Sequence, residues 1–204
     1  RIKRDGKEWS QEYRKGRPRT EVEEVGPARG TGTKITFTPD VTIFEETQYD
    51  AERIRSQLET KTFLNKGLRI VFRNLVSKET HDLHHEGGLA DYLSLLMKRL
   101  ERTASVDLPY FQERTNGIKI DLAVHWTTST REKILSYVNG IPTIDGGTHE
   151  QGLREALLKG LRSFVETHNL APRGVALTAD DLREGMLVIL SVQHPDPQFQ
   201  GQTR

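Results

Sequence analysis

Regular alternation of apolar and polar residues marks the clearest strand of this chain, at residues 117–126. Apolar side chains occupy every second position there, and polar ones such as Asp121 and His125 lie between them. This period of two is typical of a β-strand, whose polar face we expect to be solvated or functional. Residues 186–192 are apolar throughout and too few to span a membrane, which predicts a buried strand.

Shorter alternating segments predict further strands in the second half of the chain. Residues 67–73 and 81–86 are expected to pair with each other across a polar turn. Residues 134–141 are predicted to form one strand that ends at Pro142, because proline cannot continue the hydrogen-bond ladder.

The N-terminal segment predicts a β-hairpin and little other regular structure. Asp5-Gly6 separates two short alternating segments, and glycine tolerates the positive φ that a tight turn requires. Residues 15–32 are polar and rich in glycine, which indicates a mobile connection, and residues 33–38 alternate as a third strand. Because three strands without a covering helix form no stable core, residues 1–50 are expected to be the end of a truncated α/β domain.

Apolar positions three and four residues apart predict three longer helices. Residues 44–65 begin with an acidic turn, which suits the positive end of a helix dipole, and a leucine stripe runs from Leu89 to Leu100. The third helix is predicted to start with a capping box, with Thr148 as N-cap and Gln151 three residues later. Its predicted buried stripe consists of Leu153, Leu157, Leu161, Phe164 and Val165.

The order of these elements predicts two regions joined by a helix. The first region is residues 1–50, the connecting helix is residues 51–65, and the second region is residues 66–204. The second region has the order β-β-α-β-β-α-β, with a further helix start at residues 178–181 ahead of the last strand. This order, without an internal repeat, indicates the α+β class.

Composition narrows the class of protein only slightly. The 204 residues are 34% hydrophobic, and 30 Lys and Arg residues nearly balance 29 Asp and Glu residues, so no overall basic field indicates nucleic-acid binding. Cysteine is absent, which excludes disulfides and cysteine-ligated zinc. Without a signal peptide or a long apolar run, the expected location is cytoplasmic with no membrane contact. The chain opens on Arg1 and stops inside a polar loop, so we expect it to be a fragment.

Two clusters of polar side chains favour structural roles. The densest group of possible metal ligands is His81, His84, His85 and Glu86. On a strand these side chains divide between two faces, so at most two converge. A basic group that could track a DNA backbone, or could be a solvated helix face, consists of Lys98, Arg99, Arg102 and Arg114.

Two glycine-containing segments are candidates for anion binding. Residues 30–33, Gly-Thr-Gly-Thr, lack a following Gly-Lys-Ser/Thr and precede a strand, so by themselves they favour an ordinary turn. Residues 146–149 stand at a helix N-terminus, but the predicted capping box occupies some of its N–H groups, which favours a structural start. Spacing alone identifies no Ser-His-acid or paired-carboxylate arrangement, so no complete active site is expected.

The segment after the last apolar strand, residues 194–204, carries the most informative chemistry. A strand held rigidly by its burial leads into a loop with an amide at Gln202 and a permanent cation at Arg204. Such a loop can reach a phosphate group.

Five segments together resemble the B subunit of bacterial type IIA topoisomerases, which is DNA gyrase or topoisomerase IV. They are residues 30–37, 63–68, 85–88, 145–149 and 197–203. The resemblance implies the C-terminal strands of a GHKL-type ATPase domain followed by a transducer domain of the ribosomal small-subunit protein type. It also implies ATP as the cofactor with Mg²⁺, and an activity that couples ATP hydrolysis to DNA strand passage.

The resemblance assigns residues to the nucleotide. Thr33 corresponds to the threonine that binds adenine through water, and Ile35 to the aliphatic residue that lines the adenine pocket. Gln202 and Arg204 match the glutamine and lysine that reach the γ-phosphate, and they are the expected catalytic residues. Arginine at the lysine position keeps the charge but is longer and planar, so the geometry of the contact is expected to differ.

The remaining implications concern what this chain lacks and what it joins. The family's general-base glutamate, Mg²⁺-binding asparagine, adenine-binding aspartate and glycine-rich lid would all precede Arg1, so the fragment alone is expected to be inactive. The implied partners are double-stranded DNA, the topoisomerase A subunit in a heterotetramer, and a second B subunit in an ATP-dependent dimer.

Two other functions remain open at this point. One is a non-enzymatic module that binds nucleic acid or a partner protein through its helices. The other is a different GHKL ATPase, such as a mismatch-repair protein or a chaperone. The sequence does not separate gyrase from topoisomerase IV, because supercoiling depends on a domain of the partner subunit.

Overall fold

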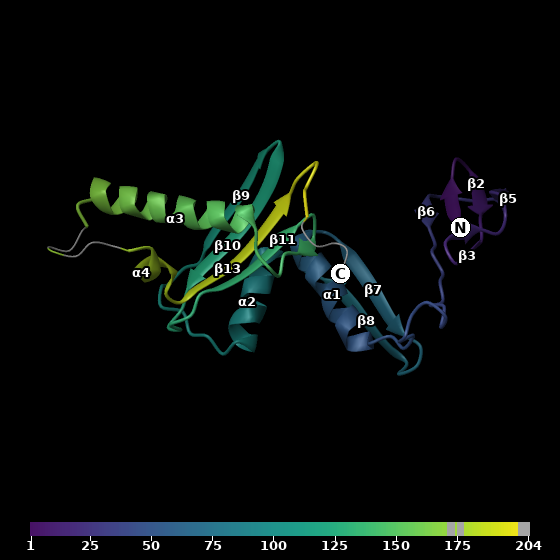
Figure 1. Ribbon diagram of the computed structural model, residues 1–204, viewed down its shortest axis with the longest axis horizontal. Coiled ribbons are helices and arrows are strands. Elements are labelled where there is room, and N and C mark those ends of the chain that lie inside the picture. Colours follow the sequence, from purple (N-terminus) through teal and green to yellow (C-terminus); the bar gives the residue numbers. More distant parts are fainter. Residues whose placement is uncertain (171–173, 175–177, 200–204) are drawn as a thin grey trace. The chain divides into compact units, whose positions relative to one another are not determined.

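The computed structural model describes residues 1–170, 174 and 178–199. The chain divides into two compact units, Arg1–Asp50 and Ala51–Arg204. Figure 1 shows a small group of strands in the first unit, and a larger sheet with its helices in the second. Each unit is described by itself.

The first unit is built around a four-stranded sheet with the order β5-β2-β1-β6. Its strands are β1 (Ile2–Arg4), β2 (Lys7–Ser10), β5 (Glu23–Pro27) and β6 (Gly32–Thr33), and a separate hairpin joins β3 (Tyr13–Arg14) to β4 (Arg17–Pro18). Asp5 and Gly6 have φ of 52° and 76° between β1 and β2, which confirms the predicted hairpin turn.

Two predictions for this unit are wrong. Residues 15–32 are not a plain connection, because they contain β4 and β5, and β5 pairs with β2 as the edge of the sheet. The predicted strand at 33–38 shrinks to the two residues of β6. This strand pairs with β1 as far as Arg1, the first residue of the sequence, so β1 offers no partner backbone to residues 35–38.

A five-stranded sheet with the order β12-β11-β13-β10-β9 forms the centre of the second unit. Its strands are β9 (Tyr110–Asn116), β10 (Ile118–Trp126), β11 (Lys133–Val138), β12 (Ile141–Pro142) and β13 (Met186–Gln193). The central strand β13 runs antiparallel to β10 and parallel to β11. Seven of its eight residues are buried, which confirms the buried strand predicted at 186–192.

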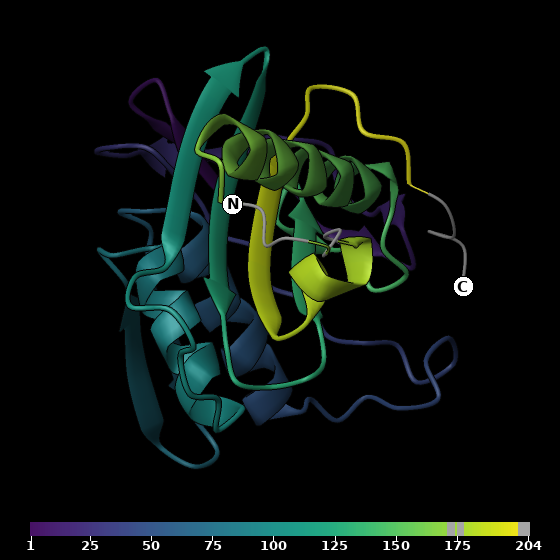
Figure 2. The same cartoon turned by 90° about the vertical axis from the view of Figure 1, so that its left-hand side faces the viewer.

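Helices cover both faces of this sheet (Figure 2). On one face, α3 (Thr148–Thr167) packs Leu153 and Leu157 against aliphatic residues of β10 and β13. On the other, α1 (Ala51–Leu64) and α2 (Leu89–Arg99) pack against the opposite side of the same strands. The polar face of β10 is therefore covered rather than solvated, and His125 is buried there.

The remaining elements flank this core. A two-stranded hairpin of β7 (Arg69–Asn74) and β8 (Glu79–His84) packs on α1, as the predicted pairing of residues 67–73 with 81–86 requires. The short helix α4 (Ala179–Arg183) has a capping box between Thr178 and Asp181, which confirms the predicted helix start. In the described part of the chain, no helix is both long enough and apolar enough to cross a membrane.

Helix boundaries differ from prediction for local reasons. Helix α1 begins at Ala51 instead of residue 44, because the Asp40 side chain accepts from the Thr42 N–H at 2.8 Å and closes a turn before it. Helix α3 has Gly147 as N-cap without a side-chain cap, so the capping box predicted at Thr148 and Gln151 is wrong.

The predicted apolar stripe of α3 is only partly correct. Leu153 and Leu157 are half-buried, whereas 52% of the Phe164 surface is exposed. The side chain that α3 buries fully is the polar Glu150, near its start. The C-terminal part of α3 is therefore largely solvated.

The strand predicted at 134–141 is divided in two, because Asn139 and Gly140 form a tight turn between β11 and β12. Strand β9 was not predicted, because all seven of its residues are exposed and lack the alternation of a half-buried strand. The observed order from β7 onward therefore contains two more strands and one more short helix than the predicted β-β-α-β-β-α-β. The α+β class itself is confirmed.

Candidate functional site

The four residues assigned to ATP by resemblance fall in different parts of the chain. Thr33 lies in β6, where it pairs with β1. Ile35 follows this strand with 81% of its surface exposed. Gln202 and Arg204 lie outside the described residues. What the structure does describe is how the segment that leads to them, residues 194–199, leaves the sheet; we refer to residues 194–204 as the terminal loop.

The terminal loop leaves the sheet at a clamp formed by the Asn139 side chain. The His194 N–H donates to Asn139 Oδ1, and Asn139 Nδ2–H donates to the His194 carbonyl, each at 2.9 Å. The Asn139 N–H also donates to the Val192 carbonyl at 2.8 Å. These three hydrogen bonds extend the parallel pairing of β11 and β13 past the ends of both strands.

The turn that carries Asn139 requires an unusual backbone. Asn139 and Gly140 have φ of 51° and 73°, the left-handed conformation of a two-residue hairpin turn. Asparagine enters this region more readily than most residues, and glycine enters it without a steric penalty. The same asparagine therefore shapes the turn and bonds the exit of the neighbouring strand.

Beyond the clamp, the first residues of the terminal loop are held by local contacts. The Asp196 N–H donates to His194 Nδ1 at 3.0 Å, and Gln198 Nε2 lies 3.4 Å from Asp196 Oδ1. Pro195 and Pro197 fix their own φ angles. The path of the loop from 194 to 198 is thus set by short-range bonds and restricted dihedrals.

Helix α1 contacts the same turn from the other side. Lys61 Nζ donates to the Gly140 carbonyl at 2.6 Å. A cavity of about 330 Å³ lies between the C-terminal end of α1, this turn and the end of β13. The Asn139-Gly140 turn is therefore bonded to both the terminal loop and α1.

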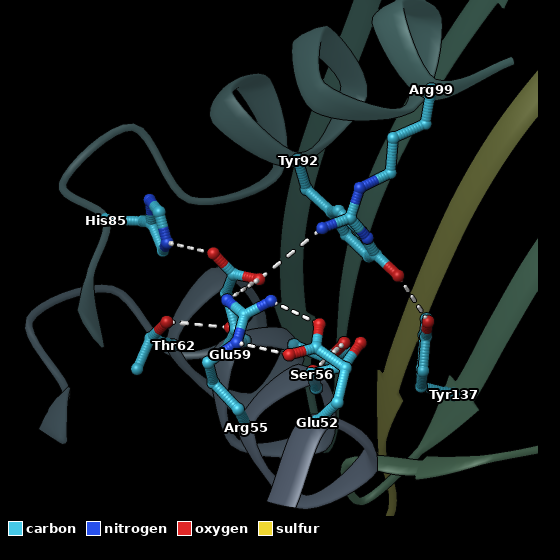
Figure 3. Close-up of polar contacts among 10 residues, drawn as sticks. Glu52, Arg55, Ser56, Glu59, Thr62, His85, Tyr92, Arg99 and Tyr137 are labelled. Carbon is cyan, nitrogen blue, oxygen red and sulfur yellow. Dashed lines mark hydrogen bonds and ion pairs between the residues drawn. The ribbon is translucent and has the colours of Figure 1, made fainter. Parts of the chain in front are cut away.

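A second polar centre lies around Glu59 of α1, and Figure 3 shows it. The Glu59 carboxylate lies 3.6 Å from Arg99 of α2, 3.8 Å from Arg55 of α1 and 3.9 Å from His85 in the segment before α2. Only 16% of its side-chain surface is exposed, so solvent screens these pairs weakly. Glu59 therefore links α1 to α2 through charge.

Aromatic side chains continue this link to the sheet. The Phe63 ring stacks on His85 at 3.7 Å and on Tyr92 at 4.8 Å between ring centroids. The Tyr92 and Tyr137 hydroxyls share a buried hydrogen bond at 2.8 Å (Figure 3). Burial raises the pKa of Tyr137, so its hydroxyl stays protonated and neutral at physiological pH. The contacts run from α1 through α2 to β11, the strand that ends in the clamp turn.

The histidine cluster of the sequence does not form one group. His85 faces α1, as described above, whereas His84 Nδ1 lies 3.3 Å from the Leu68 carbonyl and His81 stacks on Phe72. Strand β8 ends at His84, so His85 and Glu86 do not follow the alternation that the strand prediction assumed. Among the described residues, no group of three or more His, Cys, Asp or Glu side chains could hold a metal ion.

The glycine segment at residues 146–149 is occupied by groups of the protein. Thr143 Oγ1 and His149 Nε2 lie 3.0 Å apart, and the N–H groups of residues 150 and 151 donate to the Gly147 carbonyl. Ser136 Oγ donates to the buried Glu150 carboxylate. Burial lowers the pKa of His149, against an opposing effect of Glu150. This helix start is a structural network.

The basic residues near α2 are also engaged. Arg99 pairs with Glu59, and Arg102 donates to the Arg131 carbonyl at 2.9 Å. Arg114 lies on the edge strand β9, apart from that helix. The described structure therefore gives these residues intramolecular roles instead of one continuous basic track.

Sequence reasoning missed Asn139 and Glu59. The Asn139-Gly140 dipeptide is a strong hairpin signal and would have located the clamp turn. Glu59 has no comparable signal, because an isolated acidic residue on a helix ordinarily faces solvent.

Comparison with known proteins gives this geometry a family. Residues 88–204 match the family model described as DNA gyrase B. The DNA gyrase B protein of Cytophaga hutchinsonii is 38% identical over 207 residues, which are 98% of this chain and 43% of the relative. The chain thus spans less than half the length of the curated relatives it matches.

Solved structures agree with this result. The 43K ATPase domain of Thermus thermophilus gyrase B, solved with an aminocoumarin, matches 98% of this chain and 55% of its own, at 29% identity and a TM-score of 0.81. The topoisomerase IV ATP-binding domain of Francisella tularensis matches 99% of this chain and 55% of its own, at 30% identity and a TM-score of 0.84. Because the family model covers more than half of this chain and the sequence similarity extends over nearly all of it, the chain belongs to the DNA gyrase B family.

Proposed function

We propose that this chain is part of the ATPase and transducer region of an ATP-dependent type II DNA topoisomerase. In this role it couples ATP binding and hydrolysis to the passage of one DNA duplex through another. The observation that carries the proposal is the match of 98–99% of the chain to solved ATP-binding domains of gyrase B and topoisomerase IV.

The proposed domain boundaries follow the order of elements. Residues 1–50 are assigned to the end of the GHKL ATPase domain, residues 51–65 to a connecting helix, and residues 66–204 to the transducer domain. The division of the chain after Asp50 supports the first boundary. Exposed apolar side chains in residues 34–44, among them Ile35 and Phe37, support a strand region that needs further structure to cover it.

Within this function, the predicted nucleotide residues receive specific roles. Thr33 would bind adenine through water, and Ile35 would supply an apolar wall for the base. Gln202 and Arg204 would contact the γ-phosphate, where a guanidinium can chelate two phosphate oxygens and offset the charge that develops during transfer. The buried strand β13 gives these two residues a rigid base. Mg²⁺ would accompany ATP and neutralise phosphate charge, and we assign its ligands to a part of the protein other than the described residues.

The proposed partners are those of a two-subunit topoisomerase. They are double-stranded DNA, the A subunit in a heterotetramer, and a second B subunit that dimerises when ATP binds. A cytoplasmic location is proposed with them. Membership of the DNA gyrase B family argues against a non-enzymatic module and against a mismatch-repair ATPase. Topoisomerase IV stays a second candidate because its ATP-binding domain matches this chain at a TM-score of 0.84.

The test uses the intact B subunit with its A partner, ATP and relaxed circular DNA. Negative supercoiling would identify gyrase, and ATP-dependent relaxation and decatenation without supercoiling would identify topoisomerase IV. Absence of any ATP-dependent change in topology would overturn the proposal.

The role of Arg204 is tested in the same assay. We expect Arg204→Ala to lower kcat for ATP hydrolysis by roughly 100-fold, with a much smaller change in ATP affinity, because the contact strengthens as charge develops on the phosphoryl group. Arg204→Lys, the family's usual residue, serves as the matched control and should retain most of the turnover. Equal turnover of Arg204→Ala and wild type would exclude the role.

A further inference from the structure

We infer that Asn139 is a positioning residue for ATP hydrolysis, which acts by fixing the direction in which the terminal loop leaves the sheet. This inference rests on the proposed function of Gln202 and Arg204. It concerns a side chain that touches the loop and would not touch the nucleotide itself.

The bonding pattern around His194 supports this role. The Asn139 amide satisfies both the N–H and the carbonyl of His194, each at 2.9 Å, as a neighbouring strand would do. Two antiparallel hydrogen bonds to one residue restrain its orientation as well as its distance. Because the contact comes just after β13 ends, it sets the starting direction of all that follows.

Distance along the chain makes the starting direction important. Eight residues separate His194 from Gln202, a span of at most about 29 Å if fully extended. A small rotation at the root therefore moves the far end by several ångström. A misplacement of about 1 Å at a reacting group is enough to lower the rate of a reaction strongly.

The clamp is itself held in place. Lys61 of α1 donates to the Gly140 carbonyl at 2.6 Å, on the residue next to Asn139. Strand β11, which leads into the turn, is fixed by the Tyr92–Tyr137 hydrogen bond. The direction of the loop thereby depends on the position of α1, and a shift of α1 would change the direction of the loop.

The test is made in the intact B subunit with its A partner. Asn139→Gly keeps the left-handed turn, because glycine accepts the φ of 51°, and removes both side-chain bonds. We expect kcat for ATP hydrolysis to fall roughly tenfold, as the loss of two hydrogen bonds implies, with binding of a non-hydrolysable ATP analogue within about twofold of wild type.

The matched control is Asn169→Gly. Asn169 also has a left-handed backbone, with φ of 52°, and lies just after α3. We expect this variant to turn over ATP like wild type. A fall of kcat and of analogue affinity by the same factor in Asn139→Gly, or equal kcat in the two glycine variants, would overturn the inference.

Two further variants keep the test informative if Asn139→Gly folds poorly. Asn139→Asp has the same shape but places a carboxylate oxygen against the His194 carbonyl, so it should also lower kcat, and wild-type turnover in it would overturn the inference. Lys61→Met should lower kcat by about threefold alone, and should add little to Asn139→Gly because both act through one turn. If wild type itself hydrolyses no ATP, the proposed function fails first, which separates the two outcomes.

Discussion

The two faces of the five-stranded sheet are covered in different ways. Under α3, Val188 and Leu190 of β13 pack with Leu153 and Leu157, and the contact is almost entirely aliphatic. Under α1 and α2, the apolar core is combined with the Tyr92–Tyr137 hydrogen bond, the Glu59 ion pairs and buried His125. Apolar packing stabilises without specifying direction, whereas hydrogen bonds and ion pairs have preferred geometries. The difference indicates that the α3 face mainly supplies stability and the α1–α2 face mainly sets position.

The largest expected effect tests the α3 face. Leu190→Ala removes a side chain that is 3% exposed, so we expect the free energy of unfolding to fall by about 2–5 kcal/mol in urea denaturation of the intact subunit. Leu108→Ala is the control, because 82% of that leucine is exposed and its loss should change stability by less than about 0.5 kcal/mol. Similar effects of the two substitutions would contradict a stabilising core on this face.

A smaller effect is expected from the ion pairs on the opposite face. Glu59→Gln leaves Arg55, Arg99 and His85 facing a neutral amide, so we expect stability to fall by about 1–2 kcal/mol and to depend less on salt. Glu52→Gln is the control, because the Glu52 side chain is 74% exposed. Its effect should stay below about 0.5 kcal/mol. If the control is as damaging as Glu59→Gln, burial of Glu59 is not what matters.

The smallest expected effect is a change of slope with pH. Burial alone lowers the pKa of His125, so the folded protein resists a proton that the unfolded chain accepts near pH 6.5. Stability should therefore decrease as the pH falls below that value, and His125→Gln should flatten this decrease in melting curves between about pH 7.5 and about pH 5.5.

The comparison variant for the pH profile is His149→Gln, at the start of α3. Burial also lowers the pKa of His149, but the charge of Glu150 opposes the shift, so this variant should flatten the profile less. A profile that neither substitution changes would mean that other groups control the acid limb.

The parts of the fold that were predictable are those with a strong one-dimensional pattern. The apolar run that becomes β13 and the leucine spacing of α2 have one reasonable interpretation each, and the structure confirms both. Strand β9 is exposed at every position, so no pattern of burial marks it. The polar face of β10 is covered because α1 and α2 return to it from a distant part of the sequence, which alternation within ten residues cannot reveal.

The candidate site was predictable only in part and for a different reason. Thr33, Ile35, Gln202 and Arg204 came from resemblance, and their roles stay predictions. Asn139 acts through contacts 55 residues away, so its sequence neighbours indicate a turn but not the strand exit that it bonds. Glu59 likewise gains its role from side chains of other elements. Residues that position others are defined by tertiary contacts, and a single sequence does not show those.

The place of β13 also has a consequence for the way this chain is made. It is the last of the described strands along the sequence, yet it lies in the middle of its sheet, between β11 and β10. During synthesis, β9, β10 and β11 leave the ribosome before the strand that separates β10 from β11 exists. The two halves of the sheet therefore present unpaired edges to the cell until β13 arrives, which makes this interval a natural point for chaperone binding and for aggregation.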